Sequence, residues 1–112
     1  MGFTYNEKGN YDKAIEYCQK TIEIKPDYAN AFCIMGNAYH NKENYDEAIE
    51  CYQKAIELKS DDAVAYYNMG IAYQYLGDEN KANDCFQKAS MIRHNENFIE
   101  YQKEVVRPLF VL

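Results

Sequence analysis

Apolar residues recur along this chain with the spacing of an α-helix, and short polar stretches separate the apolar runs. In the segment 29–41, the residues that share one helical face are Phe32, Met35, Gly36 and Tyr39. In the segment 45–59, they are Ala48, Ile49, Tyr52, Ala55 and Ile56. Two helices of this length cannot bury both apolar faces in each other alone, so the pair needs neighbouring helices.

The same pattern returns at a fixed offset along the chain, which we call the repeat period. The sets of residues that this offset aligns are Gly2, Gly36 and Gly70; Tyr5, Tyr39 and Tyr73; and Ala14, Ala48 and Ala82. A fixed period of this length is typical of repeat proteins, in which each unit buries its apolar face against the next. The 112 residues are therefore predicted to form one domain of stacked helical hairpins.

The repeat period of about 34 residues, with these residue types, resembles the tetratricopeptide repeat family over residues 1–96. The sequence departs from the family pattern where Phe32 and Tyr66 stand in place of tryptophan. It departs again where Ser60 and His94 replace the proline that closes a repeat, which Pro26 retains. An aromatic residue still fills the first position, and the turn can form without proline. The resemblance implies an all-α, right-handed solenoid of antiparallel helix pairs with a C-terminal capping helix.

The pattern also predicts the boundaries of the units and helices. Residues 1–28 are a partial first repeat, 29–62 and 63–96 are full repeats, 97–107 are a capping helix, and 108–112 are an apolar tail. The repeat helices are expected over residues 11–25, 28–41, 45–59, 63–76 and 79–92, with no strand. Asn10 and Asn44 are expected to cap helices, and Gly77 suits a left-handed helix end. His94 is expected in a turn before the capping helix, which Pro108 ends.

The charge balance limits the class of partner. The chain carries 12 Lys and Arg against 18 Asp and Glu, a formal net charge of −6 with a pI near 4.8. The basic residues are scattered among the acids, so neither a nucleic acid nor an anionic membrane surface is an expected partner. No run approaches the roughly 18 apolar residues of a membrane span. A neutral or basic peptide suits this charge better.

The reactive residue types do not gather into a recognisable catalytic or metal site. Cys18, Cys33, Cys51 and Cys85 show no C-x-x-C spacing and have no histidine at ligand distance along a helix, so no metal or cofactor is expected. They are interpreted as small, half-buried side chains in a reducing compartment, which favours the cytoplasm. Neither histidine has a nucleophile beside it on one helical face, and no phosphate-binding loop is present, so the chain is not expected to be an enzyme.

The family resemblance implies a concave groove lined by the first helix of each unit. The lining residues expected from helical geometry are Asn30, Cys33, Asn37, His40, Asn41, Tyr67, Asn68, Ile71, Gln74 and Tyr75. This lining is rich in amides and aromatic rings and nearly free of charge, which suits an extended peptide. Asn37 and Asn68 are expected to bond a peptide backbone bidentately. The alternative is that these amides only keep an exposed surface soluble.

Some members of the family grip a chaperone's terminal carboxylate with Lys, Asn and Arg side chains in the groove. Asn37 and Asn68 fall on two of those positions, but Cys33 replaces the lysine, and Phe98 and Gln102 replace the last basic pair. Charged hydrogen bonds are roughly twice as strong as neutral ones, so this carboxylate clamp is not expected here.

The predicted function is therefore non-catalytic: a scaffold that binds an extended peptide or helix of a partner in the groove. The alternative is a structural segment of a longer array that self-assembles through exposed terminal helix faces. The partial first repeat leaves apolar residues of the helix 11–25 under-covered. Either the chain was cut from a longer array, or a homodimer forms through this N-terminal face.

Overall fold

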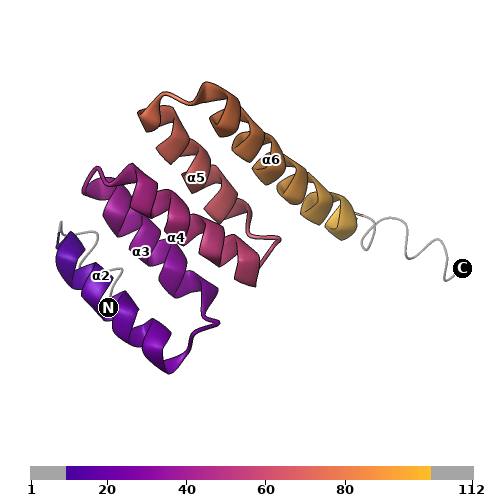
Figure 1. Cartoon of the computed structure of the whole chain (residues 1–112). Coiled ribbons are helices and arrows are strands. Elements are labelled where there is room, and N and C mark those ends of the chain that lie inside the picture. The colour runs from indigo at the N-terminus through magenta and orange to yellow at the C-terminus, as the bar shows by residue number, and fades with distance from the viewer. Residues whose placement is uncertain (1–9, 102–112) are drawn as a thin grey trace, which may run out of the picture.

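The computed structural model describes residues 10–101, and over this range the chain is a row of five helices without strands. The helices are α2 (Tyr11–Ile24), α3 (Ala29–Asn41), α4 (Tyr45–Leu58), α5 (Ala63–Leu76) and α6 (Glu79–Tyr101). Short connections join them, so consecutive helices run antiparallel and lie side by side (Figure 1). The prediction of an all-α solenoid is confirmed.

Each helix packs against the next in sequence, and α3 also contacts α5. α3 and α5 therefore lie close together on one side of the row, while α4 packs against both of them. This arrangement follows from the repeat period, because equivalent helices of successive units repeat the same contacts.

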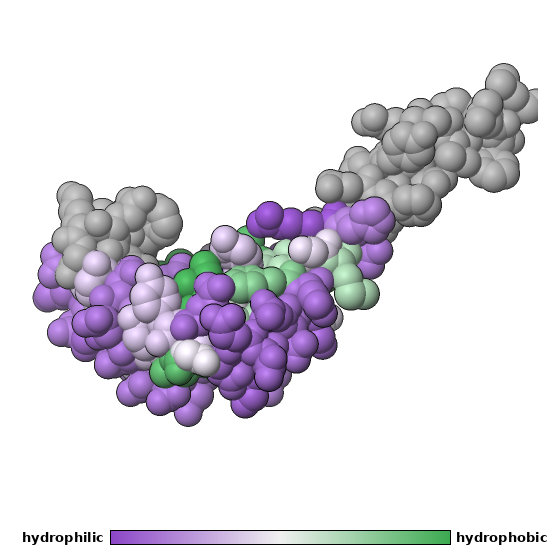
Figure 2. Space-filling view, turned by 90° about the horizontal axis from the view of Figure 1, so that it is seen from above, coloured by the Kyte–Doolittle hydropathy of each residue, from purple (hydrophilic) through white to green (hydrophobic). Residues whose placement is uncertain are grey.

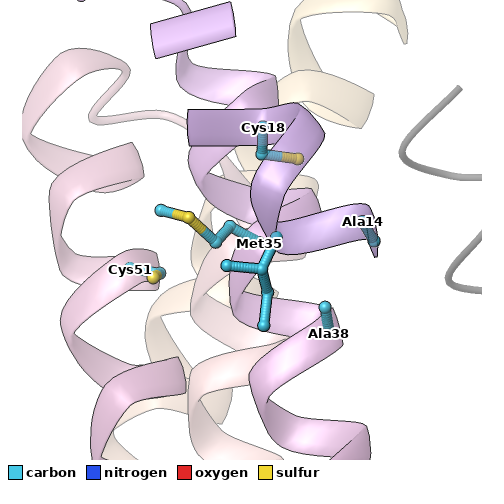
Figure 3. Packing of buried hydrophobic residues seen from close by; sticks show 6 residues of the cluster. Ala14, Cys18, Met35, Ala38 and Cys51 are labelled. Atoms are coloured by element: carbon cyan, nitrogen blue, oxygen red, sulfur yellow. The ribbon is translucent and has the colours of Figure 1, made fainter. Parts of the chain in front are cut away.

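The core consists of two clusters that are copies of each other. The first contains Ala14, Ile15, Cys18, Met35, Ala38 and Cys51, from α2, α3 and α4 (Figure 3). The second contains Ala48, Ile49, Tyr52, Met69, Ala72 and Cys85, from α4, α5 and α6. A shift by one repeat period converts every member of the first cluster into a member of the second, with a single change of residue type, Cys18 to Tyr52. The sequence analysis expected half-buried cysteines; Cys33 is half-buried, but Cys18, Cys51 and Cys85 are fully buried.

Two glycines bring paired helices into close contact. A Cβ atom at Gly36 would lie 2.7 Å from Cε1 of Tyr52, and one at Gly70 would lie 2.6 Å from Cε1 of Phe86. Both distances are well below ordinary carbon contact, about 3.5–4.0 Å. An aromatic ring of the second helix in each pair therefore occupies the space that a side chain on the first would need.

The helix ends differ in part from the sequence prediction. Asp62 caps α5 by accepting a hydrogen bond from the backbone N–H of Ala65 at 3.1 Å, and Gly77 ends α5 with φ of +86°. Asn10 and Asn44 are the N-cap residues of α2 and α4, as predicted, but neither side chain makes a capping hydrogen bond. Glu43 stands one repeat period before Gly77 and has φ of +66°, so it takes the left-handed conformation without being glycine.

The last helix is longer than predicted. α6 continues without a break from Glu79 to Tyr101, so the expected helix end at Ile92 and the turn at His94 are wrong. Asp62, whose side chain caps α5, is replaced by Glu96 one repeat period later, so the residue that starts a new helix in the previous unit has no capping counterpart here. The predicted capping helix begins at residue 97 inside α6, and its residues 102–107, the tail 108–112 and residues 1–9 lie outside the described residues. The division of the chain into repeat units stays a prediction.

Candidate functional site

The ten residues predicted to line a groove lie on α3 and α5, and together they define what we call the α3–α5 face. Its exposed members are Asn30, Asn41, Tyr67, Gln74 and Tyr75. Its half-buried members are Cys33, Asn37, His40, Asn68 and Ile71. The half-buried residues come from the sides of the two helices that approach each other, and they form the floor between the exposed ones.

Three side-chain contacts join α3 to the α5 segment along this floor. The Cys33 thiol donates to Oδ2 of Asp62, with Sγ and Oδ2 3.6 Å apart. Nδ2 of Asn68 donates to Oδ1 of Asn37 at 3.3 Å. The rings of His40 and Tyr75 meet edge to face, with centroids 5.2 Å apart. The contacts follow the same order along both helices, so α3 and α5 run parallel and are held together over most of their length.

The central contact includes a residue that the sequence analysis placed in the core. The Tyr52 hydroxyl, from α4, donates to Oδ1 of Asn37 at 2.5 Å. Asn37 Oδ1 thus accepts two hydrogen bonds, from Tyr52 and Asn68, and both of its lone pairs are used. The expectation that Asn37 bonds a peptide backbone bidentately is therefore wrong, because only its Nδ2 amide is left for a ligand. One sequence feature could have revealed this role of Tyr52. The next unit has Phe86 at the equivalent position, so the hydroxyl of Tyr52 is not needed to fill the core.

A small cavity of about 60 Å³ opens beside this hydrogen-bonded group; we call it the polar pocket. Its lining residues are Asn37, His40, Tyr52, Asn68 and Ile71, from α3, α4 and α5. Nδ1 of His40 is buried and has no hydrogen-bond partner among the described residues. Burial lowers the pKa of His40 from its ordinary value, so the imidazole is neutral at pH 7. The wall of the polar pocket is therefore uncharged at neutral pH.

An aromatic cluster surrounds His40, one of the residues that line the polar pocket. The His40 ring lies 5.1 Å from that of Tyr45 and 5.2 Å from that of Tyr75, both edge to face. The rings of Tyr45 and Tyr75 stack with centroids 5.2 Å apart. These contacts fix the orientation of His40 from two sides, because each ring pair favours a particular geometry.

The open part of the α3–α5 face is apolar along α5. Val64, which lies on the same side of α5 and which we add to the α3–α5 face, is 53% exposed, Tyr67 is 48% exposed and Tyr75 is 65% exposed. α5 contains no charged residue. These residues recur at helical spacing and project from one side of the helix. In the space-filling view, hydrophobic surface gathers between hydrophilic margins (Figure 2).

A second hollow lies on the last helix. It measures about 500 Å³ and is lined by Asn83, Phe86, Gln87, Ser90 and Met91, which we call the α6 face. The equivalent residues of α4 include Ile49 and Ile56, which pack in the cluster that α4 forms with α5 and α6. On α6 their counterparts are Asn83 and Ser90, so this face is more polar, although Met91 is 64% exposed.

Residues 10–101 show little sign of a metal site or an activated nucleophile. No group of three or more His, Cys, Asp or Glu side chains there is placed to hold a metal ion. Burial, together with the Asp62 carboxylate, raises the pKa of Cys33 to about 12, so its thiol stays protonated at neutral pH. None of the helices in this range is long and apolar enough to cross a membrane.

The comparisons with known proteins agree with this architecture. Tetratricopeptide repeat models match residues 1–28, 17–50 and 63–95, and a TPR repeat model matches residues 36–77. No curated protein sequence matches the chain. The crystal structure of MamA is 29% identical, with a TM-score of 0.82 over 86% of this chain and 56% of that one. The MamA MSR-1 C2 structure is 26% identical, with a TM-score of 0.79 over 85% of this chain and 55% of that one.

The chain thus spans a little over half the length of these MamA structures. The four family matches together reach from residue 1 to residue 95, and they include all the helices whose core clusters repeat. The chain belongs to the tetratricopeptide repeat family and is an all-α solenoid of the protein-interaction scaffold type.

Proposed function

We propose that the chain is a non-catalytic scaffold that binds an extended peptide or a helix of a partner protein along the α3–α5 face. The observation that carries this proposal is the continuous uncharged stripe on α5, in which Val64, Tyr67 and Tyr75 are each about half exposed or more. Exposed apolar area at regular spacing on a rigid helix is the usual basis of peptide recognition by helical surfaces. Tyrosine adds contact area at a low cost in side-chain entropy.

The charge distribution supports a neutral or basic partner. The face itself would not bury charged groups, because α5 has none and the α3 residues that border it are amides, Cys33 and His40. The net charge of −6 attracts a basic segment from a distance, which raises the association rate more than the final affinity. An acidic partner would be repelled before it reached the face.

The proposal is tested with a twelve-residue random peptide library displayed on phage and selected against the full chain. Selected peptides are synthesised, and their dissociation constants are measured by fluorescence anisotropy against two matched variants. Val64→Glu places one negative charge on the α3–α5 face, and Met91→Glu places one on the α6 face. Both positions are exposed, at 53% and 64%, so neither change should disturb the core.

We expect Val64→Glu to weaken binding by tenfold or more and Met91→Glu to leave it unchanged, with equal helix content in both. A glutamate at position 64 lies in the first turn of α5, where a negative charge is compatible with the helix dipole. If Met91→Glu weakens binding and Val64→Glu does not, the site is the α6 face and the proposal is wrong.

The α6 face favours a second candidate function, association between copies or units of a longer array. Its hollow of about 500 Å³ has an apolar floor at Phe86 and Met91 and no charged lining residue. Two chains of net charge −6 repel each other least where their contact surfaces are uncharged. Sedimentation velocity separates the two functions: self-association that Met91→Glu abolishes supports this second role. A homodimer through the N-terminal face, which includes residues outside the described range, stays a prediction.

A further inference from the structure

We infer that the polar pocket is a subsite of the α3–α5 face that binds the side chain of a serine or threonine in the partner peptide. This inference rests on the proposed function, because the pocket opens within that face. It goes further by assigning one residue class to one position of the ligand.

The size of the polar pocket limits its occupant. A volume of about 60 Å³ holds about two water molecules at about 30 Å³ each. A small side chain that ends in a hydroxymethyl or hydroxyethyl group fits this space. Four of the five lining residues are half-buried and only Tyr52 is fully buried, so the pocket is reached from the exposed side of the face.

The hydrogen-bonding groups of the polar pocket match a hydroxyl. Neither Nδ2 of Asn37 nor Oδ1 of Asn68 makes a hydrogen bond among the described residues, so one donor and one acceptor of the lining residues are open to a ligand. The walls therefore offer both donors and acceptors, and a hydroxyl group can serve as both at once. An aliphatic side chain would bury these polar groups without a hydrogen-bond partner, which weakens binding.

The charge of the polar pocket excludes ionised side chains. Its lining contains no charged residue, and burial holds the pKa of His40 below its ordinary value. A carboxylate, an ammonium or a phosphate would lose its hydration without meeting an opposite charge. The same argument predicts that phosphorylation of the bound serine or threonine releases the partner.

The repeat itself indicates that this pocket is not a by-product of packing. In the next unit the positions of Asn37, His40 and Tyr52 are filled by Ile71, Gln74 and Phe86. The same helix pair is thus built there with apolar residues at two of the three positions. At the α3–α5 junction the chain instead buries Tyr52, which is 1% exposed, together with its hydroxyl. Nδ1 of His40 is also buried there, without a hydrogen-bond partner among the described residues. Because the next unit packs the same helix pair with apolar residues, the polar residues at this junction support a role of the polar pocket in binding a ligand.

The test uses the phage-selected peptides and a double variant, Asn37→Ile with Tyr52→Phe. This variant copies the residues of the next unit, Ile71 and Phe86, so the scaffold has a native precedent for both side chains. The wild-type chain should select peptides that carry serine or threonine at one fixed position. Changing that residue to alanine should weaken binding about tenfold or more, and phosphoserine should weaken it further. The double variant should bind the serine and alanine peptides equally.

A second measurement locates the serine. The imidazole nitrogen signals of His40 in a ¹⁵N-histidine-labelled chain should shift on addition of the serine peptide and much less with the alanine peptide. If selected peptides bind, lose affinity with Val64→Glu, and yet tolerate alanine at every position, the inference about the polar pocket is overturned and the proposed function stands. If no selected peptide is sensitive to Val64→Glu, the proposed function and the inference both fail.

Discussion

Gly36 and Gly70 occupy equivalent positions, but alanine should be far more harmful at the first than at the second. At Gly36, the new Cβ would lie 2.7 Å from Cε1 and 2.9 Å from Cδ1 of Tyr52. At Gly70, it would lie 2.6 Å from Cε1 and 2.9 Å from Cδ1 of Phe86. The initial steric conflict is therefore the same, and the outcome depends on whether each ring can move.

Tyr52 cannot move easily, whereas Phe86 can. Tyr52 is 1% exposed, and its hydroxyl bonds Asn37, so a shift of the ring disturbs the core cluster and that hydrogen bond together. Phe86 is half-buried and borders the hollow of about 500 Å³ on α6, which gives the ring space. Overpacking a closed core costs about 1–3 kcal/mol, and more when a hydrogen bond is lost as well. Replacing a helical glycine with alanine returns about 1 kcal/mol of helix propensity.

The expected balance is a loss of about 1–2 kcal/mol of unfolding free energy for Gly36→Ala and a change of less than about 0.5 kcal/mol for Gly70→Ala. Urea unfolding followed by circular dichroism at 222 nm measures both values. In thermal unfolding, the two midpoints should differ by about 4 °C or more. The unchanged chain and the two variants are measured together. Because both variants replace a helical glycine with alanine, an effect common to that replacement appears in both.

Equal losses at the two positions would refute the reasoning, because they would show that the freedom of the ring does not decide the cost. A larger loss for Gly70→Ala would show that the hollow beside Phe86 is filled in solution. Adding Tyr52→Phe to Gly36→Ala should recover part of the loss, since the ring is then released from Asn37.

Three further predictions concern helix ends and thiols. Asp62→Ala removes the α5 cap and the acceptor of the Cys33 thiol, and should cost about 1 kcal/mol in urea unfolding, whereas Asp61→Ala should be neutral. Glu43→Gly removes the backbone strain of a non-glycine residue with φ of +66°. The unfolding free energy should increase by up to about 1 kcal/mol, which is measured as a higher urea midpoint. Burial raises the pKa of both Cys33 and Cys51 from 9.0 to about 12, so the unfolded chain loses these protons first. Stability should fall as the pH rises from 9 towards 12, and a Cys33→Ala, Cys51→Ala variant should lose less over that range; an equal loss would exclude the thiols as its cause.

Much of the candidate site followed from helical spacing, but its internal chemistry did not. The spacing of Tyr67, Gln74 and Tyr75 predicts that they share one side of α5, and all three are exposed. The same spacing says nothing about Tyr52, whose hydroxyl reaches Asn37 from a different helix. A helical pattern identifies which face is buried, but it cannot say which polar atoms of three separate helices will meet.

The amino-acid sequence alone determined the type of fold, because a fixed repeat period specifies which faces repeat and hence which helices must stack. It also gave most helix limits, since Pro26 and Gly77 stop helices by local backbone preference. Only the tertiary structure decided how α3 meets α5: the contacts of Asn37 with Asn68 and of His40 with Tyr75 join residues that are far apart along the chain. The distance between such side chains depends on how closely the helices approach, and Gly36 and the alanines of the core control that approach through packing rather than through pattern.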